Sequence, residues 1–188
     1  DLGIAKGFFA RLKDFVFGEA ESRLVRPMAV VAGDGVIHVA DPGAGGVHRF
    51  DTKAGDYRLI PGPGGTPLPS PVGLARGADG EVYVTDSKLA QVFVIRRDAA
   101  EAAPLRLDAP LRQPTGIAFD AATRRLYVAD TAQHRIAVFA ADGRTVAQIG
   151  RRGPADGEFN YPTYLCLAAE GRLYVTDSLN FRLQAFDA

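Results

Sequence analysis

Four aspartates recur at nearly constant spacing, and their carboxylates are the clearest candidates for functional groups in this chain. Asp41, Asp86, Asp130 and Asp177 each end a segment close to Tyr-Val-Thr-Asp, and they are separated by 45, 44 and 47 residues. Each aspartate stands directly before a turn, where a carboxylate can accept backbone N–H bonds and fix the loop. Because the position repeats, we expect these carboxylates to have a structural role.

Two arginines follow the last two aspartates at a fixed distance. Arg135 comes five residues after Asp130, and Arg182 comes five residues after Asp177. This spacing suits an ion pair inside one repeat or a contact between repeats, with ligand binding by the guanidinium groups as the alternative. We therefore place Arg135 and Arg182 with the aspartates as structural repeat positions.

The histidines and the single cysteine show no pattern of a metal or catalytic site. His38 and His48 lie in predicted strands and His134 lies in a predicted loop, and no pair of them has metal-ligand spacing. One cysteine, Cys166, excludes an internal disulfide, and its small apolar position predicts an inert buried thiol. No nucleophile elbow, phosphate loop or paired-carboxylate motif is present. We therefore expect no catalytic residues, no metal and no cofactor.

The repeat that carries the aspartates has the pattern of a small antiparallel sheet. A proline opens a short apolar run upstream of each aspartate, and proline suits the first residue of a strand. A turn signal such as Asp79-Gly80 then joins this run to the strand that ends in aspartate, which predicts a hairpin. A third strand follows, and fourth strands are predicted at 57–60, 105–107 and 145–149. The apolar runs are too short for a helical repeat.

A four-stranded unit that repeats about every 45 residues predicts an all-β chain with propeller architecture. One small twisted sheet cannot bury both faces until neighbouring sheets pack against it. The predicted blades lie near 26–61, 71–108, 114–150 and 162–188, the last one truncated. Residues 1–25 form an N-terminal extension whose apolar spacing predicts a short amphipathic helix. This helix is expected to pack against the propeller, with binding to a membrane surface as the weaker alternative.

The last two repeats resemble NHL repeats. Residues 157–162 read Gly-Glu-Phe-Asn-Tyr-Pro, 174–177 read Tyr-Val-Thr-Asp, and 180–186 read Asn-Phe-Arg-Leu-Gln-Ala-Phe, in the order and spacing of that family. The first two repeats fit loosely, with Gly46 and Gln91 at the arginine position. The resemblance, which is to bacterial NHL-repeat proteins, implies about six blades. We therefore expect a fragment holding about four of them, with open blade edges that favour self-association.

Two sets of loops are predicted to share one face of the propeller. In a four-stranded blade, the loop that leads into the blade and the loop between its second and third strands lie on the same side. Binding residues concentrate in loops on rigid scaffolds, and this composition suits a protein partner or unpaired bases; a plain solvated face is the alternative. The candidate ligand-binding residues there are Lys88, Arg112, Gln113, His134, Arg151, Arg152, Asn160, Tyr161, Asn180 and Phe181.

Three residues of the predicted first strands carry expectations about packing. Ile117 and Leu165 both lie three residues after a strand-opening proline, and we expect both to be buried between blades. Tyr164 stands where the other repeats have alanine or glycine, so its ring is expected to project towards the central channel or a junction between blades.

The absence of a reactive cluster favours a non-catalytic binding or scaffolding propeller that presents the loop face to a protein or small ligand. One alternative is a lyase or hydrolase whose channel site is completed by other blades, as the resemblance to the peptidyl-amidating lyase propeller implies. A lesser alternative, single-stranded RNA binding, is disfavoured because 22 basic residues are balanced by 22 acidic ones. Resemblance to bacterial proteins with lipoprotein-type export signals implies the cell envelope or periplasm, although this chain contains no such signal.

Overall fold

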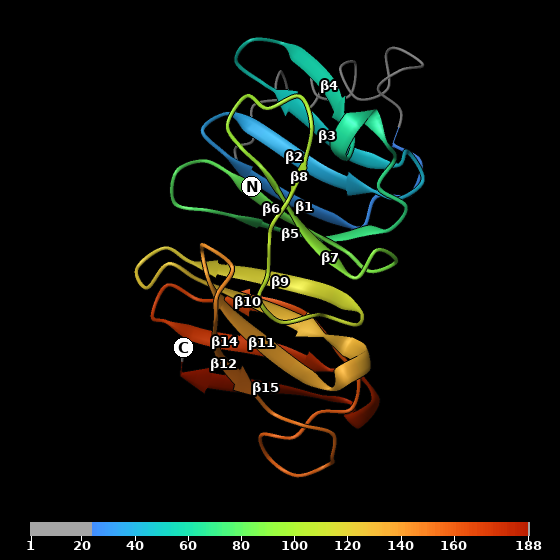
Figure 1. Cartoon of the computed structure of the whole chain (residues 1–188). Coiled ribbons are helices and arrows are strands. Elements are labelled where there is room, and N and C mark those ends of the chain that lie inside the picture. Colours follow the sequence, from blue (N-terminus) through green and yellow to red (C-terminus); the bar gives the residue numbers. More distant parts are fainter. Residues whose placement is uncertain (1–23, 188) are drawn as a thin grey trace, which may run out of the picture.

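The computed structural model describes residues 24–187, which form four antiparallel sheets in sequence order (Figure 1). The chain is all-β over this range: it contains no α-helix, only the short 3-10 turns η2 (Pro63–Gly65), η3 (Thr131–Gln133) and η4 (Ser178–Asn180). The amphipathic helix predicted within residues 1–25 falls almost wholly outside the described residues.

Each sheet is a meander in which consecutive strands pair. The first sheet contains β1 (Ala29–Gly33), β2 (Val36–Asp41), β3 (Gly46–Asp51) and β4 (Asp56–Ile60), and the second contains β5 (Pro71–Arg76), β6 (Val82–Asp86), β7 (Gln91–Ile95) and β8 (Ala103–Pro104). The third contains β9 (Pro114–Asp120), β10 (Arg125–Asp130), β11 (Arg135–Ala140) and β12 (Thr145–Ile149). The fourth contains β13 (Pro162–Leu167), β14 (Arg172–Asp177) and β15 (Arg182–Asp187).

Local sequence signals account for the hairpins. Asp34 and Gly35 form the two-residue turn between β1 and β2, and both have positive φ, 58° and 85°. This conformation twists in the same sense as the flanking strands and favours Asp-Gly. Strand-opening prolines begin β5, β9 and β13, as the sequence predicts.

One predicted strand is displaced. The fourth strand of the second sheet was expected at 105–107, whereas β8 covers only Ala103 and Pro104. Proline has no N–H to donate to the ladder, so pairing with β7 is brief. Beyond Pro104 the N–H of Leu105 donates to the carbonyl of Val92 at 2.9 Å, and the side chain of Gln91 donates to the carbonyl of Leu105 at 2.7 Å.

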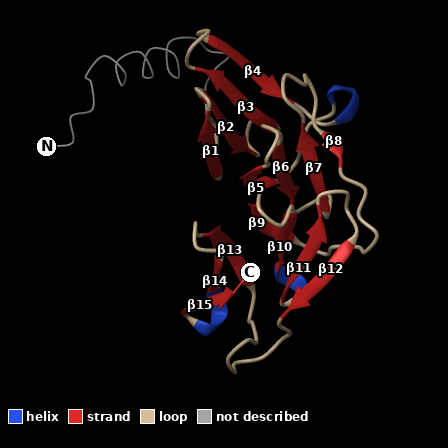
Figure 2. Ribbon diagram, turned by 90° about the vertical axis from the view of Figure 1, so that its left-hand side faces the viewer, coloured by secondary structure: helices blue, strands red, loops and turns tan. Residues whose placement is uncertain are grey.

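The sheets follow one another around an arc, with β4, β8 and β12 on the outside (Figure 2). The inner strands β1, β5, β9 and β13 are neighbours along this arc. Three apolar clusters fill the three spaces between consecutive sheets. This is the packing of propeller blades, in which each sheet buries its faces against the next.

Hydroxyl groups tie neighbouring inner strands together. Thr85 and Ser87, which flank the aspartate of the second sheet, donate to backbone carbonyls of Thr115 and Pro114 in β9. Thr131, the counterpart of Ser87 in the third sheet, donates to the carbonyl of Pro162 in β13 at 2.6 Å. The second and third blades therefore each fix the start of the blade that follows.

Glycine allows the inner strands to approach closely. A Cβ on Gly73 would collide with the carbonyl of Thr115, and a Cβ on Gly116 would collide with the backbone of β13. Tyr164 occupies the same position in β13, where no further inner strand lies within the described chain, and its side chain is 56% exposed.

Within the described residues the fourth sheet is covered on one face only, and this corrects two expectations. Cys166 is exposed, although its counterpart Ala118 is buried, because the thiol lies on the uncovered face. Leu165 packs against the cluster between the third and fourth sheets but is only half-buried, whereas Ile117 is buried as expected. The difference arises because β9 has an inner strand on each side and β13 has one.

Candidate functional site

The loop face is built on the four repeated aspartates, all of which are buried. Asp41 accepts hydrogen bonds from the N–H groups of Val25 and Arg26, in the loop leading into the first blade, at 2.7 and 2.9 Å. It also accepts from Gly43 and Ala44, in the loop after β2, at 2.8 and 3.0 Å. One carboxylate therefore ties together the two loops that form this face.

Asp86 joins the two loops in the same way, Asp177 does so through the side chain of Asn180, and Asp130 accepts N–H groups of the entry loop only. The backbone donors are Ser70, Lys88 and Leu89 for Asp86, Arg112 and Gln113 for Asp130, and Asn160 for Asp177. Three of the candidate binding residues, Lys88, Arg112 and Gln113, thus use their backbones to hold the loops. Their side chains are exposed and are available to a ligand.

Arg182 and Arg135 are engaged inside their own blades. Nε of Arg182 donates to Asp177 at 2.9 Å, and its Nη2 donates to two backbone carbonyls of the loop leading into the fourth blade. Arg135 lies farther from Asp130, at 3.5 Å. The structure therefore places both guanidinium groups against the aspartates rather than towards an incoming ligand.

Burial and hydrogen bonding act in opposite directions on two of the carboxyl groups. Burial raises the pKa of Asp41, but four backbone N–H groups lower it by more, so the pKa lies below its ordinary value. Burial also raises the pKa of Asp177, and the donors from Asn160, Asn180 and Arg182 again outweigh it. Both groups are carboxylates at neutral pH.

These lowered pKa values make stability depend on pH. A carboxyl whose pKa is lower in the folded chain stabilises the fold above its unfolded value and loses this contribution as the pH falls through the folded value. We expect the urea midpoint to fall steeply below about pH 4. Between about pH 5 and pH 3 the urea midpoint of the Asp177→Asn variant should fall by less than that of the parent protein. Parallel pH profiles for the two proteins would contradict this prediction.

The residue that ends each loop between second and third strands has positive φ. Gly45, Ala90, His134 and Phe181 occupy this position, with φ of 72°, 54°, 54° and 53°. Left-handed backbone costs roughly 1–2 kcal/mol for residues other than glycine. Strained backbone held by its surroundings is a feature of binding sites, and here it holds a histidine and a phenylalanine at the tips of two neighbouring loops.

His134 and Tyr161 meet at the junction of the third and fourth blades. The N–H of Tyr161 donates to Nδ1 of His134 at 3.2 Å, and the two rings pack edge to face with centroids 4.5 Å apart. His134 is buried and Tyr161 is exposed. The histidine therefore positions the tyrosine, which is the member of the pair that a partner can reach.

The loop 150–161 is held against the fourth blade by polar contacts. Nδ2 of Asn180 donates to the carbonyl of Gly153 at 2.9 Å and to Asp177 at 2.8 Å. Arg151 pairs with Glu158 at 3.0 Å, although its side chain is largely exposed. Asn180 thus supports the loop, while Arg151 and Arg152 extend from it into solvent.

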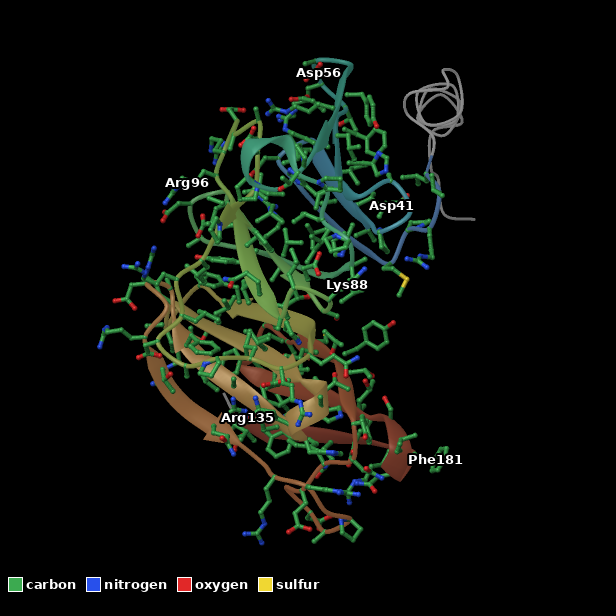
Figure 3. All side chains as sticks on the ribbon, turned by 45° about the vertical axis from the view of Figure 1, so that its right-hand side comes forward. Asp41, Asp56, Lys88, Arg96, Arg135 and Phe181 are labelled. Carbon is green, nitrogen blue, oxygen red and sulfur yellow. The ribbon has the colours of Figure 1, made fainter. Side chains whose placement is uncertain are left out.

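Phe181 is the most exposed large apolar residue of this face, with 91% of its surface accessible. Leu179, in the turn η4 that directly precedes Phe181, is also exposed, and the sequence pattern did not indicate it. Figure 3 shows Asp41, Lys88 and Phe181 along one side of the molecule. The accessible part of the loop face therefore combines apolar and basic side chains.

Residues 24–187 hold no metal-binding cluster and no helix that could span a membrane. No three His, Cys, Asp or Glu side chains gather there in an arrangement that could hold a metal ion. None of the described helices is long and apolar enough to cross a bilayer.

The third and fourth blades match a known repeat. The sequence signature described as "NHL repeat" matches residues 111–139 and 159–186. The chain is also 31% identical over 131 residues to peptidyl-glycine alpha-amidating monooxygenase of Mus musculus. That alignment covers 62% of this chain but only 13% of the relative, so the chain spans about an eighth of that protein's length.

Solved propellers share the fold at low identity. Virginiamycin B lyase from Staphylococcus aureus superposes with a TM-score of 0.64 at 16% identity, covering 85% of this chain and 55% of the lyase. A chain of the nidogen/laminin complex gives a TM-score of 0.67 at 23% identity, covering 86% and 60%. These likenesses concern the fold alone.

Proposed function

Because the chain belongs to the NHL-repeat β-propeller family, we propose that it is a non-catalytic binding propeller whose loop face engages a protein partner. The observation that carries this proposal is Phe181, an aromatic ring that is 91% exposed on a left-handed backbone. An exposed ring held at energetic cost at a loop tip gains free energy only when another surface covers it.

The surroundings of Phe181 have the composition of a protein interface. Tyr161 and Leu179 are exposed near it on the fourth blade, and Arg151 and Arg152 extend from the adjacent loop. Aromatic residues and arginine are enriched at interface hot spots. The fold is also found in a complex of nidogen with laminin, which supports a protein rather than a nucleic acid as the partner.

The ring around this face is proposed to contain about six blades, of which four are present here. In the fourth sheet Thr176 and Ser178 occupy the positions of Thr85 and Ser87, whose hydroxyls bind the next inner strand, and both now bond to Thr163. They are suited to hold a following blade. Tyr164 would keep that blade's inner strand farther away than the glycines do elsewhere.

A second candidate, a propeller lyase or hydrolase, is favoured by the similarity to the amidating monooxygenase. Its site would need ligands from several blades, including blades beyond the four described. Metal analysis of a protein that contains the whole ring distinguishes this enzyme from a non-catalytic binding propeller. Bound metal in stoichiometric amount would favour the enzyme.

Replacing Phe181 with glycine is expected to weaken partner binding by about 2 kcal/mol or more, roughly 30-fold. Glycine adopts positive φ without strain, so the variant should fold at least as stably as the parent. Binding is measured by capture from the native extract with the immobilised protein, followed by titration of the captured partner. The double variant Arg151→Ala/Arg152→Ala should also bind the partner more weakly than the parent protein.

The matched control is Lys53→Ala, an exposed basic residue in the turn between β3 and β4 on the opposite face. It should leave capture unchanged. Undiminished capture by Phe181→Gly, or loss of capture with Lys53→Ala alone, would move the site away from the loop face.

A further inference from the structure

A cavity of about 220 Å3 lies between the first and second sheets, at the end of the strands opposite the loop face. All four strands of the first sheet contribute to its walls, together with β5, β6 and β7 of the second. Figure 3 shows Arg96, which follows β7, on the side of the molecule opposite Asp41, Lys88 and Phe181. The cavity is therefore distinct from the loop face that is proposed to bind a protein partner.

Arginine dominates the lining of this cavity. Five guanidinium groups, those of Arg49, Arg58, Arg76, Arg96 and Arg97, face three carboxylates, those of Asp34, Asp51 and Asp98. A fourth carboxylate, Asp56, lies outside the lining and reaches Arg49 at 3.6 Å. Positive charge is in excess whether or not this aspartate is counted.

Two of the arginines form ion pairs with these carboxylates. Arg76 lies 2.6 Å from Asp34. Arg49, which is buried, lies 3.2 Å from Asp51 and 3.8 Å from Asp98. These pairs form the fixed, internally neutralised part of the wall.

The other three arginines form no ion pair with any residue from 24 to 187. Arg58 and Arg97 donate only to backbone carbonyls, those of Asp98 at 3.4 Å and Asp79 at 3.5 Å. Nε of Arg58 is buried and has no hydrogen-bond partner within residues 24–187. A buried donor of a charged group that lacks an acceptor is costly, so an anion that accepted a hydrogen bond from Arg58 would stabilise this wall.

Two glycines make room for these side chains. The guanidinium of Arg76 occupies the space where a Cβ on Gly33 would lie, and that of Arg97 lies over Gly80. A Cβ at either glycine would require the guanidinium group to shift. The present positions of Arg76 and Arg97 therefore depend on glycine at the end of β1 and in the turn before β6.

His38 also lines the cavity, and the nearby arginines affect its pKa. Burial and the neighbouring charges of Arg49, Arg76 and Arg58 lower the pKa of His38 to about 4. The imidazole is neutral at pH 7 and adds no positive charge to the wall. It does provide a ring whose titration reports on any anion that enters.

We propose that this cavity binds a phosphate group, either inorganic phosphate or the phosphate of a small monoester. Guanidinium groups donate paired hydrogen bonds to phosphate oxygens, and a phosphate monoester offers three acceptor oxygens to the three unmatched arginines. The cavity is smaller than the ~300–1,000 Å3 typical of sites for larger ligands. This size fits a compact oxyanion.

Calorimetric titration of the protein with inorganic phosphate at neutral pH tests the proposal. We expect one saturable site, weakened by about tenfold or more in Arg58→Ala and in Arg97→Ala. Arg97 is exposed, so its variant should fold normally even if Arg58→Ala does not. Arg144→Ala, an exposed arginine on the same face of the third sheet that pairs with Asp142, should bind as the parent does.

Two further measurements identify the ligand class. Methyl phosphate binding more tightly than inorganic phosphate would assign the site to esters, and the reverse order would assign it to the free ion. Phosphate, but not chloride, should raise the pKa of His38 in an NMR titration, because a bound anion offsets the arginines. Absence of saturable binding, binding of acetate as tight as phosphate, or equal loss in Arg144→Ala would overturn the proposal.

Discussion

Replacing Asp177 with alanine is expected to destabilise the protein by about 3–5 kcal/mol. The side chain is fully buried, and its oxygens accept from the N–H of Asn160 at 2.6 Å and from the side chains of Asn180, Arg182 and Gln184 at 2.8, 2.9 and 3.1 Å. Alanine would leave the N–H of Asn160 and Nε of Arg182 without an acceptor, and Arg182 without its buried counter-charge. The cost of unpaired polar groups exceeds the net value of the bonds themselves.

Urea unfolding followed by circular dichroism at pH 7 measures the effect. Asp187→Ala is the matched control, because Asp187 ends the neighbouring strand in full solvent exposure and its loss should not shift the midpoint. Removing Arg182 together with Asp177 should cost less than the two single changes added, since the partners couple. A midpoint for Asp177→Ala equal to that of Asp187→Ala would show that the carboxylate does not hold the loops.

Much of the blade architecture could be predicted because its causes are local and repeated. A strand-opening proline, a two-residue Asp-Gly turn and an aspartate before the next turn each act within a few residues. Most predicted strands and turns therefore occur where expected, and the exception, β8, differs because Pro104 interrupts the ladder.

The arginine-lined cavity could not be predicted in the same way. Arg49 and Arg58 come from the first sheet and Arg76 and Arg97 from the second, and only the packing of the two sheets brings them together. The adjacent pair Arg96-Arg97 was the one signal in the sequence. The contact of His134 with Tyr161 is also a product of packing, since it joins two blades across 27 residues.

Burial at equivalent positions depends on the neighbouring sheet rather than on the repeat. Cys166 and Ala118 share a position, but the first is exposed and the second is buried. In a repeat protein each unit contacts only its neighbours, so the terminal units lack one interface. Sequence periodicity predicts which side chains align and does not show which of them are covered.

Ile117→Ala and Leu165→Ala test this distinction directly. Ile117 is 5% exposed within the cluster between the second and third sheets, and its truncation should cost about 2–5 kcal/mol. Leu165 is equivalent in register but half-buried, so its truncation should cost about 1–2 kcal/mol, in proportion to the apolar surface it buries. The exposed Val146→Ala serves as the control and should leave the urea midpoint nearly unchanged.

The comparison also reports on what covers β13 in solution. If the two truncations are equally costly, another surface must pack against Leu165, and the equality should disappear on dilution if that surface is a second copy of the chain. If Ile117→Ala has no effect on the midpoint, the space between the second and third sheets is not a packed core, and the propeller arrangement itself is wrong. The ratio of the destabilisation by Leu165→Ala to that by Ile117→Ala therefore measures how far another surface, outside these four sheets, stabilises the fourth blade.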